Sequence, residues 1–117
     1  MTMSRYSVFD MRINNLDVDE VYDFVSSNKN NKDNFKFIVT PNVDHFSRYV
    51  KLNSTRKLYD NADICCLDSR VFRLLLRFRL NKWVKVCPGS DLTEKVLLSS
   101  ISKNKITFVG EKCFLSI

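Results

Sequence analysis

Short apolar runs alternate with segments of helical periodicity along this chain, and that alternation most constrains its fold. Five runs are strand candidates: residues 6–13, 35–40, 63–68, 83–87 and 105–109. The run at 35–40 is nearly all apolar, as expected of a strand covered on both faces. Strands that alternate with helices favour right-handed crossovers and a mostly parallel sheet. We therefore expect an α/β fold, Rossmann-like with flanking helices, in a single domain over residues 1–117.

Four helices are predicted from apolar residues spaced three and four apart. Their apolar stripes are Val18, Val21, Tyr22 and Val25; Val43, Phe46 and Val50; Val71, Leu74, Leu75 and Phe78; and Leu92, Val96, Leu97 and Ile101. Asp17 or Asp19 can cap the first helix, and Asp91 with Glu94 forms a capping pair for the fourth. The second helix is expected to continue into the 50s.

The composition is that of a globular protein. Apolar residues make up 44% of the 117 residues, enough for one domain with a core. No apolar run approaches the roughly 20 residues of a membrane span, and the N-terminus lacks the apolar core of a signal peptide, so we expect a cytoplasmic protein. The net charge of +6 favours anionic partners such as phosphates, nucleic acid or an anionic membrane face.

The cysteines and the single histidine argue against a metal site. No CxxC motif and no Cys/His pair appears among the four cysteines, so buried, reduced thiols are the better interpretation. His45 falls in the first turn of the second predicted helix. A structural role is preferred for it, and contact with a substrate is the minor alternative.

Polar clusters follow three of the strand candidates, at residues 40–42, 68–70 and 88–91. In open parallel sheets, ligands bind beyond the carboxyl ends of the strands. We therefore expect these three clusters to meet on one rim of the sheet.

Each rim residue also has a structural interpretation. Partial burial would make the Asp68 carboxylate a better proton acceptor near neutrality, but a cap for the following helix is somewhat favoured from sequence alone. Thr40 offers a hydroxyl to a substrate or simply ends a strand. Asn42 is a natural N-cap, and a helix N-terminus at a strand end also suits anions. Gly89 permits close approach of a ligand to the backbone, although its turn is not a P-loop.

A basic segment covers residues 70–85, which contain no acid. Its cations are Arg70, Arg73, Arg77, Arg79, Lys82 and Lys85. Two interpretations of this segment are weighted evenly. One is a solvated face of an amphipathic helix, and the other is an electrostatic attraction to diphosphate or to an anionic membrane surface. Nucleic acid is disfavoured, because the cations form one short patch without a binding motif.

Four stretches together resemble the WecG/TagA/CpsF family of bacterial glycosyltransferases. They are IVTPNVDHF at 38–46, LYDNADICCLDSRV at 58–71, CPGSDL at 87–92 and ITFVG at 106–110. The resemblance covers nearly the whole chain. It implies inverting transfer of an N-acetylmannosamine-type sugar from a UDP donor, without a bound metal or other cofactor. The implied acceptor is a lipid-linked sugar on undecaprenyl diphosphate, in the synthesis of teichoic acid or surface polysaccharide.

The resemblance also implies roles for the rim. Asp68 is the implied base that removes the acceptor hydroxyl proton, and Thr40 joins it as a catalytic residue in contact with the substrate. The implied substrate-binding residues are Asn42, Ser69, Arg70, Gly89, Ser90 and Asp91.

Two departures from the family pattern change these expectations. Many members have Pro-Asp-Gly where this chain has Leu67-Asp68-Ser69, which keeps the carboxylate and alters the turn. Members also continue past the strand at 106–109, with parts that hold the nucleotide and a segment tied to membrane association. We therefore expect this chain to correspond to the N-terminal half, impaired if truncated, with an open sheet edge that favours homo-oligomers. Peripheral contact with the inner face of the membrane through the basic segment is a further expectation.

A non-catalytic basic α/β module is the alternative function. It would use residues 70–85 to bind an anionic membrane or nucleic acid.

Overall fold

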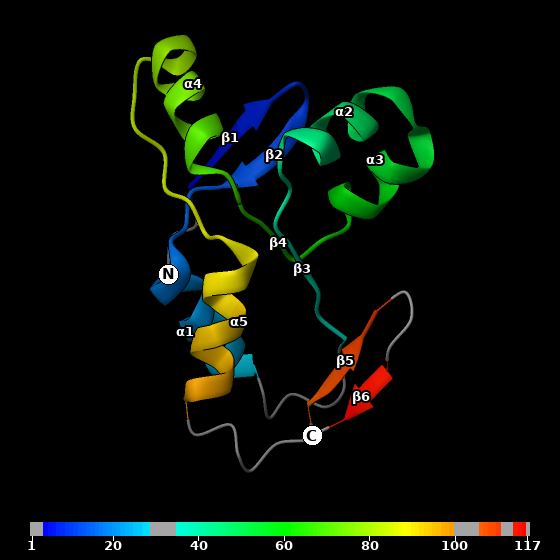
Figure 1. Ribbon diagram of the computed structural model, residues 1–117. Helices are drawn as coiled ribbons and strands as arrows, with labels where there is room; N and C mark the ends of the chain where they lie inside the picture. The colour runs from blue at the N-terminus through cyan, green and yellow to red at the C-terminus, as the bar shows by residue number, and fades with distance from the viewer. Residues whose placement is uncertain (1–3, 29–34, 100–105, 111–113, 117) are drawn as a thin grey trace.

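The computed structural model describes residues 4–28, 35–99, 106–110 and 114–116 (Figure 1). Its elements are β1 (Arg5–Val8), β2 (Met11–Asn14), α1 (Val18–Asn28), β3 (Ile38–Val39), α2 (Val43–Lys51), α3 (Asn53–Asp60), β4 (Ile64–Cys65), α4 (Arg70–Leu80), α5 (Gly89–Leu98), β5 (Thr107–Val109) and β6 (Phe114–Ser116). The prediction of an α/β chain is confirmed as a mixed α/β architecture.

The centre of the fold is the parallel pair formed by β3 and β4. Backbone hydrogen bonds continue beyond both strands. The Asp63 N–H donates to the Phe37 carbonyl at 3.0 Å, and the Asp68 N–H donates to the Pro41 carbonyl at 3.1 Å. The chain from Phe37 to Pro41 therefore runs alongside the chain from Asp63 to Asp68, and both deliver their polar ends to the same edge.

The other strand pairs differ from the predicted sheet. Within the described residues, β1–β2 and β5–β6 are antiparallel and each pair stands as its own two-stranded sheet. A mostly parallel, Rossmann-like sheet is thus not confirmed. Residues 83–87, a predicted strand, form no strand, although the Cys87 N–H donates to the Leu67 carbonyl at 2.8 Å. That bond brings the end of this segment beside β4.

The predicted strand at 6–13 is instead a β-hairpin. Val8 lies opposite Met11, and the two turn residues, Phe9 and Asp10, both have positive φ, at 48° and 69°. Positive φ at both positions is the conformation of a two-residue type I′ turn. The sequence concealed this turn, because Phe9 is not one of the residues that usually adopt it.

Side chains alternate across the central pair and fill two apolar clusters. Cys65 and Leu67 of the β4 segment join the cluster formed with the hairpin, α2 and α4. Ile64 and Cys66 join the opposite cluster, which includes Val21 of α1. Figure 1 shows α1 and α5 side by side below the central pair, with the hairpin, α2 and α4 above it. The β4 segment is therefore covered on both faces.

The run at 35–40 is less buried than predicted. Ile38 and Val39 are half-buried, and Phe35 is 89% exposed. The physical reason is that, among the described residues, β3 pairs with β4 alone and so lies at the edge of its sheet.

Two of the predicted helices have different ends. The second divides into α2 and α3, because Leu52 is extended, with φ −124° and ψ 118°. The fourth, α5, has Pro88 as its N-cap with no side-chain cap, so the predicted Asp91–Glu94 capping pair is wrong. The predicted stripe residue Ile101 lies outside the described residues. At α1, the prediction of an Asp17 cap is confirmed: Asp17 Oδ1 accepts the Glu20 N–H at 2.9 Å.

The face of α4 that enters the core is not the predicted one. Phe72 and Leu76 are buried, and the ring of Phe72 packs against Phe46 with centroids 4.9 Å apart. The predicted core stripe is between 50% and 81% exposed; it comprises Val71, Leu74, Leu75 and Phe78. Because α4 carries two apolar faces, periodicity alone could not decide which one is buried.

The prediction of buried thiols is confirmed for the described cysteines, Cys65, Cys66 and Cys87, which are free and buried. Burial raises the pKa of the Cys65 thiol to about 12. A hydrogen bond between Cys66 and Cys87 raises the pKa of the Cys66 thiol and lowers that of Cys87. Cys113 lies outside the described residues.

Replacing Asn14 with alanine tests how the hairpin is joined to the central pair. Asn14 is buried, and its Oδ1 accepts the buried Cys65 N–H at 2.9 Å. Asn14→Ala leaves that donor unpaired and should lower the free energy of unfolding by about 1–3 kcal/mol in urea denaturation. Asn53→Ala, at an exposed position of α3, is the matched control and should change it by less than about 0.5 kcal/mol. Equal stability of the two variants would contradict this role.

Candidate active site

Thr40, Asp68 and Gly89 lie together at the carboxyl end of the central pair. A Cβ built on Gly89 would be 2.8 Å from Thr40 Oγ1 and 3.9 Å from Asp68 Oδ1. Both side-chain oxygens are therefore within 4 Å of one point. Residues that are far apart in sequence meet here for two reasons. β3 and β4 are parallel, and the chain at Cys87, just before Gly89, is hydrogen-bonded to Leu67, just after β4.

The carboxylate of Asp68 holds the start of α5. Its Oδ1 accepts the Gly89 N–H at 2.7 Å, and this bond supplies the cap that Pro88 cannot provide. No hydrogen bond reaches Oδ2 from the residues that the structure describes. Asp68 is half-buried, and only its Oδ1 is anchored by a described hydrogen bond.

The predicted alternative role of Asp68, a cap for the following helix, belongs to its neighbour. Ser69 is the N-cap of α4, and its Oγ accepts the Phe72 N–H at 3.1 Å. This leaves Ser69 with a structural role at the rim. Asp68 is thereby directed toward α5 rather than α4.

Gly89 is required by close approach and not by backbone conformation. The described glycines have no positive φ. The 2.8 Å separation between a built Cβ and Thr40 Oγ1 is shorter than real Cβ contacts allow, so the absence of a side chain lets α5 begin against Thr40.

Asn42 acts as the N-cap of α2, as its structural interpretation predicted. Its Oδ1 accepts the His45 N–H at 3.1 Å, and His45 Nδ1 accepts the Asn42 N–H at 3.0 Å. This reciprocal capping box occupies both side chains. The structural interpretation of His45 is likewise supported, and a substrate contact by Asn42 stays a prediction.

The remaining rim residues flank the cluster at the starts of α4 and α5. Arg70 and Asp91 face each other with Nη2 and Oδ2 3.7 Å apart, and both side chains are substantially exposed. An exposed pair at this distance contributes little to stability. Arg70 is thus available to a ligand, and Ser90 is exposed in the first turn of α5.

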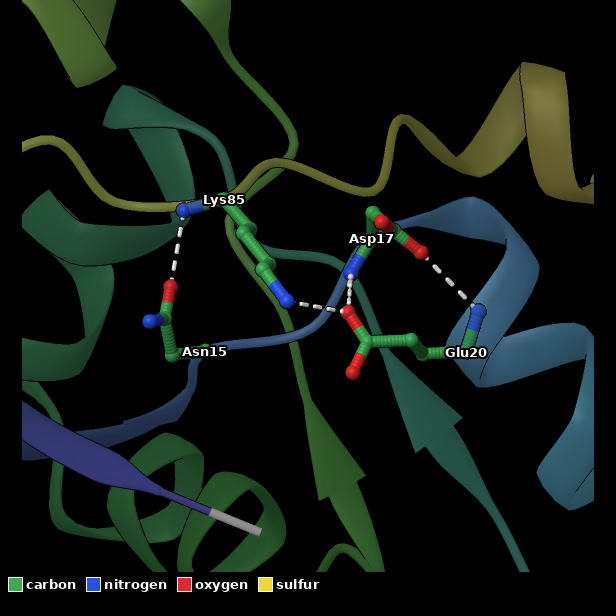
Figure 2. Close-up of polar contacts among 4 residues, drawn as sticks. All are labelled: Asn15, Asp17, Glu20 and Lys85. Carbon is green, nitrogen blue, oxygen red and sulfur yellow. Dashed lines mark hydrogen bonds and ion pairs between the residues drawn. The ribbon is translucent and has the colours of Figure 1, made fainter.

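A polar network that the sequence did not reveal positions the segment leading to Gly89. Figure 2 shows Asn15, Asp17, Glu20 and Lys85. Asn15 Oδ1 accepts the backbone N–H of Lys85 at 2.7 Å, and Lys85 Nζ donates to Glu20 Oε1 at 2.6 Å. Glu20 is itself held by Asp17 in the capping box of α1. The segment that precedes α5 is in this way tied to the start of α1.

The charges of this network reinforce each other. The hydrogen bond from Lys85 lowers the pKa of the Glu20 carboxyl, and the same bond raises the pKa of the Lys85 ammonium. Both groups stay ionised across the neutral range. In the sequence, only the amide of Asn15 and the opposite charges of Glu20 and Lys85 point to this network. Asn15 and Glu20 lie 70 and 65 positions from Lys85, so no local pattern connects them.

The rim combines a half-open carboxylate, a hydroxyl and the start of a helix. A carboxylate can accept a proton from an attacking hydroxyl group. A helix N-terminus and an arginine both suit the negative charge of a phosphate. The described residues contain no group of three or more His, Cys, Asp or Glu side chains arranged to hold a metal ion. No described helix is both long and apolar enough to cross a membrane.

These features define a mixed α/β protein with a polar rim at the carboxyl end of its central strand pair. The sequence matches the model of the glycosyl transferase WecG/TagA/CpsF family over residues 6–113, and the chain belongs to that family. Membership implies a glycosyltransferase of cell-surface polysaccharide synthesis. No curated protein and no solved structure gives a significant match.

A double-mutant cycle on Gly89 and Thr40 tests the geometry of the rim. Gly89→Ala should lower the free energy of unfolding by about 1–3 kcal/mol, because the new methyl group meets Thr40 Oγ1. Thr40→Ala removes that oxygen, so the double variant should recover most of the loss. Urea denaturation of the parent, the two single variants and the double variant gives the coupling free energy between the two positions. Strictly additive effects would show that the two residues are not in contact.

Proposed function

We propose that this chain carries the acceptor-activating half of an inverting glycosyltransferase. The donor is a UDP-linked N-acetylmannosamine-type or related sugar, and the acceptor is a sugar linked to a polyprenyl diphosphate lipid. The observation that carries the proposal is the rim itself. Asp68 is anchored through Oδ1 to Gly89, its Oδ2 accepts no hydrogen bond from the described residues, and the Thr40 hydroxyl lies nearby.

The proposed reaction is a single displacement. The acceptor hydroxyl oxygen attacks the anomeric carbon, and the bond from that carbon to the diphosphate oxygen breaks on the opposite side. Asp68 Oδ2 takes the hydroxyl proton as the new bond forms. The departing UDP carries the electron pair and its negative charge. The guanidinium of Arg70 is suited to that charge.

The other rim residues have supporting roles in this proposal. Thr40 donates its hydroxyl to a sugar oxygen, and Ser90 does the same from the first turn of α5. Asp91 lies 3.7 Å from Arg70 and can direct its guanidinium toward the rim. Asn42 and Ser69 act mainly through the helices that they cap, which fixes the walls of the rim.

An apolar groove beside the rim suits the lipid part of the acceptor. It has a volume of about 340 Å³ and is lined by Phe9, Val43, Phe46, Ser47, Val50, Lys51 and Phe72. Five of these residues belong to α2, while Phe9 comes from the hairpin turn and Phe72 from α4. Two of its residues, Val43 and Phe72, lie in the first turns of α2 and α4, whose N-caps are the rim residues Asn42 and Ser69.

Asp68→Asn separates the catalytic role of Asp68 from its structural one. The asparagine Oδ1 can still accept the Gly89 N–H, so stability should change little, whereas proton acceptance is lost and sugar transfer should fall at least 100-fold, on the order of a general-base contribution. Asp68→Ala, the matched comparison, should lose both transfer and stability. Transfer from UDP-sugar is measured on this chain and on a version extended by the C-terminal region of a family member. Full turnover by any Asp68→Asn version would contradict the base assignment.

The alternative, a non-catalytic basic module, is tested by binding. Titrations with UDP-sugar and with oligonucleotides at two salt concentrations distinguish the two functions. Binding of UDP-sugar without tight oligonucleotide binding supports the transferase. Tight, salt-sensitive oligonucleotide binding without UDP-sugar binding would favour the alternative.

A further inference from the structure

We propose that the outward face of α4, formed by Val71, Leu74, Leu75 and Phe78, docks on an anionic lipid bilayer. These residues recur at the spacing of one helical face and are 72%, 50%, 58% and 81% exposed. They form an apolar surface that the described part of the chain leaves open to solvent.

The arrangement of side chains around α4 is that of a helix with two apolar faces and two basic flanks. At about 100° per residue, Phe72, Leu76 and Leu80 fall on the inward face, opposite the outward one. Arginines separate the two faces: Arg70, Arg73 and Arg77 lie on one flank, and Arg79 lies on the other. The inward face is in the core, so the outward face is the one that a partner can cover.

The charge of the segment selects a bilayer as the partner. Residues 69–90 contain six cations and no acid. Four of the cations, Arg73, Arg77, Arg79 and Lys82, form no ion pair with any described carboxylate. An apolar helical face bordered by cations is the pattern of helices that lie in the headgroup region of anionic membranes.

Trp83 adds a second interfacial feature. Its ring is 56% exposed, and the guanidinium groups of Arg73 and Arg77 lie over it at 5.0 and 5.6 Å from the centroid. Tryptophan is enriched at the level of lipid headgroups, because its ring is apolar with one polar edge. Trp83 lies three residues after the end of α4 and would enter that layer with the arginines.

Other partners fit these observations less well. Two copies of the same face would bring like charges together, which disfavours self-association. Nucleic acid would pair with the arginines but would leave the apolar residues without a partner. A bilayer with anionic headgroups satisfies both parts of the surface.

Docking through α4 would bring the rim close to the membrane. α4 begins at Arg70, directly after its N-cap Ser69, and Asp68 is the residue before that cap. A lipid-linked acceptor could then reach Asp68 without leaving the bilayer. This consequence rests on the proposed function, whereas the docking itself does not.

Vesicle flotation of the full chain tests the proposal without any measurement of sugar transfer. Vesicles of phosphatidylcholine alone are compared with vesicles of equal parts phosphatidylcholine and phosphatidylglycerol. Trp83 is the only tryptophan in the chain, so its emission reports directly on the segment. We expect flotation with the anionic vesicles, a blue shift of the emission, and weakening of both by added salt.

Variants assign the binding to the outward face. Leu75→Ser with Phe78→Ser should weaken partitioning roughly tenfold or more, because two large apolar side chains no longer enter the lipid. Phe35→Ser, at a site that is 89% exposed outside α4, is the matched control and should bind like the parent. Circular dichroism confirms that each variant is folded.

Four outcomes would overturn the proposal. They are no binding to anionic vesicles, equal binding to neutral ones, undiminished binding by the serine pair, and a lipid-free dimer that the serine pair converts to monomer. The last result would assign the face to a second copy of the chain. Sugar transfer is measured separately, without vesicles. If the serine pair transfers sugar as well as the parent there, the proposed function stands in each of these cases.

Discussion

The hydrogen bond from the Gly89 N–H to Asp68 Oδ1 is the contact on which the candidate site depends. It joins the end of the β4 segment to the first residue of α5, at 2.7 Å. Pro88 offers no side-chain cap, so the helix begins on a carboxylate supplied by a distant part of the chain. The same carboxylate presents its second oxygen to the rim. A single residue thus fixes the geometry and supplies the proposed base.

Several polar anchors make that contact possible. Asn14 holds β4 against the hairpin through the Cys65 N–H, and Asn15 holds the segment before α5 through the Lys85 N–H. Lys95 of α5 pairs with Asp19 of α1 and fixes the far side of the helix. These contacts act on backbone groups or helix surfaces away from the rim. These anchors therefore support the position of the rim from outside it.

The rim was predictable from the sequence because apolar runs end at polar residues. Thr40 and Asp68 follow such runs, and Gly89 opens a turn into a helix, so parallel strands place them together. Their detailed roles were not predictable. The cap of α5 by Asp68 joins residues 21 positions apart, and no local pattern records it. The outward face of α4 was likewise mistaken for its core face, since both faces are apolar and only tertiary packing distinguishes them.

The most direct measurement of the central contact uses the small number of glycines. The chain has two, Gly89 and Gly110, so labelling with ¹⁵N-glycine gives two amide signals and an internal reference. The account predicts that the Gly89 amide exchanges slowly with solvent, and that Asp68→Ala both accelerates its exchange and shifts its signal while leaving Gly110 unchanged. A Gly89 amide that exchanges as fast as an exposed one, and does not respond to Asp68→Ala, would contradict the account.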